Sequence, residues 1–202
     1  MIKPRKSGQL IVISGPSGVG KSTVIAEVMH RRERLTFSIS YTTRGPRAGE
    51  QDGVNYHFVD QKEFERMIQA DELLEYTCYQ GHYYGTSLKA IQEELDSGCD
   101  VLLDIEVEGG SNVRRKSRNA VLIFVAPPSF EELSRRLCGR RSESEEVIQG
   151  RLKRAHEEIR EIPNYDYLVV NDSVEKAAND IISILTAEHC RIDNRYLKME
   201  GE

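Results

Sequence analysis

The sequence predicts a three-layer α/β fold with a mostly parallel sheet. Four compact apolar runs have the length and composition of buried strands: residues 9–14 (QLIVIS), 100–106 (DVLLDIE), 120–128 (AVLIFVAPP) and 166–172 (DYLVVND). Polar or helical stretches separate these runs, which is typical of a parallel sheet covered by helices on both faces. The remaining observation is a glycine-rich loop that directly follows the first run.

This loop, GPSGVGKST at residues 15–23, leads into residues 21–32, where apolar residues have helical spacing. It matches G-x-x-x-x-G-K-[ST] in full. Backbone N–H groups of such a loop point at phosphates, the helix start is positive, and the lysine adds a point charge. We therefore expect bound ATP, with Ser22 as a ligand of Mg²⁺. The expected contacts are Gly15, Pro16, Ser17, Gly18, Val19, Gly20, Lys21, Ser22 and Thr23.

Two segments interrupt the strand and helix pattern. Residues 40–97 are rich in tyrosine, glycine and charge, with one helix expected at 61–70, and they are interpreted as an inserted subdomain. A polar segment of Arg, Ser and Glu follows residue 138 and is either a second insertion or simply a solvated helix face. Tyr79 and Tyr83 are expected to pack in a core.

Composition narrows the possible functions. A length of 202 residues favours one domain. The net charge of −5 argues against a general nucleic-acid binder. No apolar stretch approaches the roughly 20 residues of a membrane-spanning helix, and the first residues lack a secretory signal, so a cytoplasmic location is expected. The four cysteines are scattered, which indicates neither a zinc site nor a disulfide framework.

The class of phosphate-loop protein follows from further residues. No Asn-Lys-x-Asp segment is present to read guanine as a switch GTPase would, and a helicase or motor would need a longer chain. A small kinase with a small acceptor remains. Arg44 and Arg47 flank a Gly-Pro turn, and guanidinium groups grip phosphate through paired hydrogen bonds. With Tyr56 as a further donor, they form a candidate monophosphate site.

With these motifs the chain resembles the guanylate kinases, from about Gln9 to about Leu185. The matching segments are Ser40, Arg44, Arg47, Glu50 and Tyr56; Glu75 followed by Tyr84, Gly85 and Thr86; and Asp104-Ile105-Glu106. The chain departs from the family pattern at two positions: Glu106 stands where the family has an aspartate, and Glu108 where the family often has a glutamine.

The resemblance implies a role for each of these residues. Arg44, Arg47, Tyr56 and Tyr84 would hold the phosphate of GMP. Ser40 and Thr86 would lie at the base edge and Asp104 close to the acceptor. Guanine presents two adjacent donors, N1–H and the 2-amino group, and the carboxylate of Glu75 can accept from both, so AMP should be rejected, on the order of 10⁴-fold. The expected GMP-binding residues are Ser40, Arg44, Arg47, Glu50, Tyr56, Glu75, Tyr84, Thr86 and Asp104.

The resemblance also implies a lid over ATP, at about residues 138–151. Its arginines would neutralise the transferring phosphoryl group. The candidates are Arg136, Arg140, Arg141 and Arg151, with Arg140 and Arg151 preferred, and Asn171 is expected near adenine. The expected catalytic residues are Lys21, Arg44, Arg140 and Arg151.

The resemblance therefore predicts a P-loop kinase core with an inserted GMP-binding subdomain and a lid. The kinase-like domain spans residues 9–188, with its core at 9–39 and 98–188, the insertion at 40–97 and a tail at 189–202. The expected reaction is ATP + GMP to ADP + GDP with Mg²⁺, and the oligomeric state stays open. Two alternatives remain: a kinase for another acceptor such as a phosphorylated sugar, which would not use Glu75, and a peptide-binding module that has lost catalysis, whose phosphate loop should be damaged.

Overall fold

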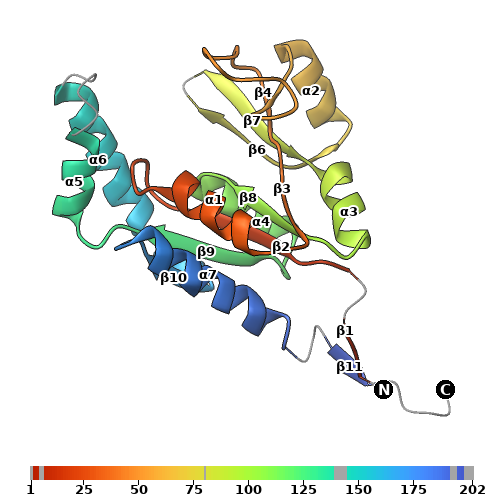
Figure 1. Ribbon diagram of the computed structural model, residues 1–202. Helices are drawn as coiled ribbons and strands as arrows, with labels where there is room; N and C mark the ends of the chain where they lie inside the picture. Colours follow the sequence, from red (N-terminus) through yellow and green to blue (C-terminus); the bar gives the residue numbers. More distant parts are fainter. Residues whose placement is uncertain (1, 5–6, 80, 139–144, 192–194, 198–202) are drawn as a thin grey trace.

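The computed structural model describes residues 2–4, 7–79, 81–138, 145–191 and 195–197 of the chain. Its centre is a parallel sheet of five strands in the order β10–β9–β2–β8–β3 (Figure 1). The strands are β2 (Leu10–Ser14), β3 (Leu35–Phe37), β8 (Asp100–Asp104), β9 (Val121–Ala126) and β10 (Tyr167–Val170). The four strands expected from apolar runs are therefore confirmed, and β3 is an additional edge strand.

Helices cover both faces of this sheet (Figure 1). Because successive strand residues point to opposite faces, Ile11 and Ile13 of β2 pack with α1 (Lys21–Arg31) and α7 (Val174–Glu188). Leu10 and Val12 instead join the cluster that contains Ile91 of α3 (Leu88–Asp96) and Val113 of α4 (Val107–Lys116). The expected three layers are confirmed.

A second sheet lies above the core in the view of Figure 1 and forms, with α2, the four-stranded subdomain. Its order is β5–β4–β7–β6, with β4 and β6 antiparallel to β7. Phe64 of α2 is buried and stacks on Tyr83 at a centroid distance of 5.2 Å, as expected for Tyr83. The elements are β4 (Tyr41–Thr42), β5 (His57–Phe58), α2 (Gln61–Gln69), β6 (Leu73–Tyr79) and β7 (His82–Ser87), so the helix expected at 61–70 is confirmed.

The remaining elements lie at two ends of the molecule (Figure 1). Helices α5 (Phe130–Cys138) and α6 (Glu145–Ile159) pack together through Leu133, Leu137 and Ala155. A short 3-10 helix, η1 (Ile162–Asn164), follows α6. Strand β1 (Ile2–Pro4) pairs antiparallel with β11 (Arg195–Leu197), away from the sheets. Among the described residues, no helix has the length and apolar character needed to span a membrane.

Candidate active site

The glycine-rich loop joins the carboxyl end of β2 to the start of α1, as its motif predicts. Gly15 cannot be replaced without moving the chain, because an added Cβ would stand 2.1 Å from the carbonyl oxygen of Val125. Gly20, with φ of 94°, has the left-handed conformation that glycine adopts without strain and precedes the first residue of α1. Ser22 and Thr23 are exposed on the first turn of this helix.

Lys21 lies between the loop and the neighbouring strand. Its Nζ donates to the carbonyl oxygen of Gly15 at 2.8 Å and stands 3.9 Å from Oδ1 of Asp104. Parallel pairing of β2 with β8 sets Ile13 beside Asp104, which brings the two side chains to one sheet edge. Burial raises the pKa of Asp104, although the Lys21 ammonium opposes this.

Two side chains hold the loop from outside the nucleotide motif. The buried Asn171 donates from Nδ2 to the carbonyl oxygen of Val19 at 2.8 Å. Arg136 of α5 donates to the same oxygen and to the backbone oxygen of Asn171, both at 3.1 Å. Asn171, expected near adenine, therefore contacts the loop backbone directly, and Arg136 rigidifies the same region.

A cavity of about 370 Å³ lies between the loop and the four-stranded subdomain. It contains most of the residues that the sequence predicts for GMP, together with Ser17 of the loop, so it opens against the predicted ATP site. Thr86 and Glu50 are not among its lining residues, but they form hydrogen bonds with Glu75 and Arg44, which do line it. The lining residues are Ser17, Ser40, Arg44, Arg47, Tyr56, Glu75, Thr77, Tyr79, Tyr84, Gly85, Asp104, Ile105, Glu106 and Gly109.

One end of the cavity is basic. Arg44 donates to both carboxylate oxygens of Glu50, each at 2.9 Å, and its guanidinium lies 5.3 Å from the centroid of the Tyr56 ring. The Arg44 guanidinium and then the Arg47 backbone N–H hold the pKa of Glu50 below its usual value. Glu50 thus orients Arg44, while the Arg47 guanidinium makes no hydrogen bond within the described part of the chain. Burial raises the pKa of Tyr56, which keeps its phenol a donor.

The other end holds a buried acid. Glu75 is 5% exposed, and burial raises the pKa of its carboxyl to about 7. The Thr86 hydroxyl donates to its Oε1 at 2.6 Å, and a Cβ added at Gly109 would stand 2.9 Å from Oε2. Glu75 is therefore confined between β7 and the start of α4, where it lines the cavity.

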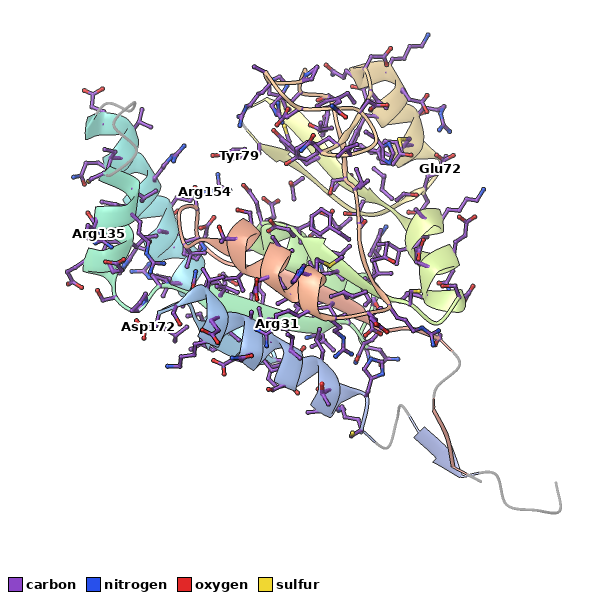
Figure 2. All side chains as sticks on the ribbon, viewed as in Figure 1. Arg31, Glu72, Tyr79, Arg135, Arg154 and Asp172 are labelled. Carbon is purple, nitrogen blue, oxygen red and sulfur yellow. The ribbon has the colours of Figure 1, made fainter. Side chains whose placement is uncertain are left out.

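The predicted lid residues have different outcomes. Arg140 and Arg141 lie outside the described residues, and Arg151 lies on α6. Sequence reasoning missed Arg154 on the same helix, whose guanidinium lies 4.4 Å from the centroid of the Tyr79 ring (Figure 2). Tyr79 lines the cavity and contacts this arginine, so its expected core packing was wrong. Spacing alone gives no signal for a contact between α6 and β6.

Comparison with known proteins agrees with this geometry. The family model described as guanylate kinase matches residues 7–188 of the chain. The chain belongs to the guanylate kinase family. It is 49% identical to the guanylate kinase of Halalkalibacterium halodurans over 187 residues, which cover 93% of this chain and 92% of that protein. It is also 49% identical to the guanylate kinase of Lactococcus lactis over 198 residues, covering 96% and 97%.

The fold agrees with family membership. The crystal structure of guanylate kinase from Anaplasma phagocytophilum superposes with a TM-score of 0.79 at 35% sequence identity, covering 96% of this chain and 92% of that chain. The three-layer core with its phosphate loop is thus a guanylate kinase architecture.

Proposed function

We propose that the chain transfers the γ-phosphoryl group of ATP to GMP, giving ADP and GDP. The observation that carries this proposal is one cavity that joins Arg44 and Arg47 to the buried Glu75 and opens beside Ser17 of the phosphate loop. Such a cavity has a basic end for a monophosphate and a carboxylate for a base with two donors. It also directs the acceptor phosphate towards a nucleoside triphosphate held by the loop.

At the basic end, we propose that Arg44, Arg47, Tyr56 and Tyr84 hold the GMP phosphate. Planar guanidinium groups suit phosphate oxygens, and Glu50 fixes the plane of Arg44 through two hydrogen bonds. An acceptor phosphate is already a competent nucleophile once aligned, so the reaction needs positioning and charge neutralisation more than a general base.

At the acidic end, we propose that Glu75 accepts from N1–H and the 2-amino group of guanine. Ser40 lines the same cavity and would contact the base edge, while the Thr86 hydroxyl orients Glu75. Binding of guanine would favour the ionised carboxylate. An adenine ring would offer neither of these two donors and would leave Thr86 as the carboxylate's partner, so we expect selectivity for GMP over AMP.

At the donor side, residues 15–23 would hold ATP, and Lys21 would neutralise the phosphates that react. The Ser22 hydroxyl is a hard oxygen ligand at the helix start beside Lys21, which suits Mg²⁺, an ion that takes few protein ligands. When bound, the ion would neutralise phosphate charge. Asn171 would act through its contact with the loop backbone, and Arg140 and Arg151 would approach from the lid.

We infer the following division of the chain into a core, an insertion, a lid and a tail. Residues 9–39 and 98–188 would form the core, 40–97 the GMP-binding insertion, about 138–151 the lid and 189–202 a tail. We also infer a cytoplasmic location, because both proposed substrates are nucleotides of that compartment.

The test is ADP formation from ATP with GMP, dGMP, AMP, CMP and dTMP as parallel acceptors. We expect rapid turnover with GMP and a rate with AMP that is lower on the order of 10⁴-fold. Comparable rates with AMP, or no turnover with GMP, would contradict the proposal. A phosphorylated sugar, assayed as a sixth acceptor, would support the alternative kinase if it outperformed GMP. Inactivity of the folded protein with every acceptor would support the peptide-binding module.

A further inference from the structure

Arg154 joins three separate parts of the molecule. From α6, its Nη2 donates to Oε2 of Glu106 at 2.5 Å, and its Nε donates to Oε1 of Glu158 one turn along the helix at 3.0 Å. The same guanidinium lies over the ring of Tyr79, at 4.4 Å from the ring centroid. Figure 2 shows Arg154 and Tyr79 close together between α6 and the four-stranded subdomain.

Tyr79 and Glu106, the two partners of Arg154 outside α6, both line the cavity proposed to bind GMP, which is called the acceptor cavity below. Tyr79 comes from β6, the strand that carries Glu75, and Glu106 follows Asp104 at the end of β8. Both residues line the cavity, whereas Arg154 is not among its lining residues. Tyr79 and Glu106 are therefore the contacts through which Arg154 can act on the shape of this cavity.

The orientation of Glu106 depends on this contact. Glu106 is the N-cap residue of α4, but its side chain accepts no hydrogen bond from the first turn of that helix. A capping carboxylate would be fixed by its own helix. Here the carboxylate accepts instead from the guanidinium of Arg154, which comes from a different element.

The chemistry is specific to arginine. A planar guanidinium can stack on an aromatic face and donate in its own plane to two carboxylates at once. A lysine ammonium at this position could pair with one carboxylate as a point charge but could not keep the stacked, forked arrangement.

We propose that Arg154 is a positioning residue that ties α6 to the wall of the acceptor cavity and, by holding Tyr79 and Glu106, strengthens binding of the acceptor nucleotide. The proposal rests on the proposed function. Arg154 also links the cavity to α6, the helix that carries Arg151, so the position of α6 depends on the positions of Tyr79 and Glu106.

Removal of this contact should leave the protein folded. The Arg154 and Glu106 side chains are 39% and 42% exposed, and exposed ion pairs contribute little to stability. Unfolding temperatures of the variants check this directly and separate a change in the cavity from a loss of fold.

The experiment measures KM for GMP, KM for ATP and kcat in the full chain. The variants are Arg154→Ala, Arg154→Lys, Tyr79→Leu and the double variant that combines Arg154→Ala with Tyr79→Leu. Lys153→Ala is the matched control, since it removes an exposed positive charge from the adjacent position of α6. We expect Arg154→Ala to raise KM for GMP about tenfold, because small displacements of positioning groups weaken alignment strongly. KM for ATP should stay within about twofold of wild type.

The other variants sharpen the test. KM for GMP in Arg154→Lys should be closer to that of Arg154→Ala than to wild type, because lysine cannot keep the stacked arrangement. KM for GMP in the double variant should be no higher than in Arg154→Ala, because both single substitutions remove the same contact between Arg154 and Tyr79. The control should match wild type. An unchanged KM for GMP in Arg154→Ala, an equal effect in the control, or multiplying effects in the double variant would overturn the inference. If wild type itself fails to turn over GMP, the proposed function fails instead.

Discussion

The phosphate loop is one continuous segment, whereas the acceptor cavity is assembled from side chains spread between Ser17 and Gly109. The loop depends on backbone geometry at Gly15 and Gly20, and its main side-chain charge is Lys21. The cavity depends on side chains that are fixed by other side chains, as Glu50 fixes Arg44 and Thr86 fixes Glu75. Binding of the donor should therefore tolerate changes in the cavity, while binding of the acceptor should depend on individual side-chain pairs.

The largest effect should come from the donor side. We predict that Lys21→Met lowers kcat on the order of 10³-fold, because a charge aimed at the transferring group is lost while side-chain bulk is kept. Steady-state ADP formation measures this, and calorimetry should show GMP binding within about twofold of wild type. A variant with more than about a tenth of wild-type kcat would show that the loop lysine is dispensable.

The next largest effect should come from the base end of the cavity. We predict that Glu75→Gln lowers kcat/KM for GMP on the order of 10³-fold, because the amide places a donor where guanine also donates. Glu72→Gln is the control, since Glu72 lies on the surface and pairs with Arg66. A normal kcat/KM for GMP in Glu75→Gln would mean that the base is read elsewhere.

A smaller effect should follow when the support of Arg44 is removed. Glu50→Gln keeps the shape of the side chain but loses the charge, so KM for GMP should rise about tenfold through misplacement of the Arg44 guanidinium. Glu63→Gln breaks a similar forked pair with Arg66 on the exposed face of α2 and should change nothing. Equal behaviour of the two variants would argue against a role for Glu50 in the site.

The smallest effect should be a dependence of GMP binding on pH. Burial raises the pKa of Glu75 to about 7, so the neutral form dominates below that pH and cannot accept from both guanine donors. GMP binding should therefore tighten as pH rises through about 7, by up to about tenfold per pH unit on the acid side. The phosphate of GMP also titrates near pH 6 and changes the affinity in both proteins. The pH dependence due to Glu75 is therefore the part of the wild-type affinity profile that Glu75→Gln lacks. A profile unchanged by this substitution would assign the step to another group.

The difference between the two regions also explains what the sequence could predict. The strands, the loop and the helix at 61–70 follow from local patterns, since each element is contiguous. The motifs of Arg44 and Glu75 predict a role for each residue because one residue type suits each task, and the structure brings both residues to one cavity. The contact of Arg154 with Tyr79 and the support of the loop by Asn171 join residues far apart in sequence. Such contacts depend on how the elements pack, and periodicity or spacing does not encode them.

The separation of the two nucleotides between loop and cavity is tested most directly by crossed titrations. GMP and a non-hydrolysable ATP analogue are titrated separately into Lys21→Met and Glu75→Gln, with dissociation constants measured by calorimetry. We predict that Glu75→Gln weakens GMP binding at least about a hundredfold and leaves binding of the analogue within about twofold. Lys21→Met should instead weaken binding of the analogue and leave GMP binding within about twofold. A substitution that weakens both nucleotides equally, or a Glu75→Gln variant with normal GMP affinity, would contradict the account.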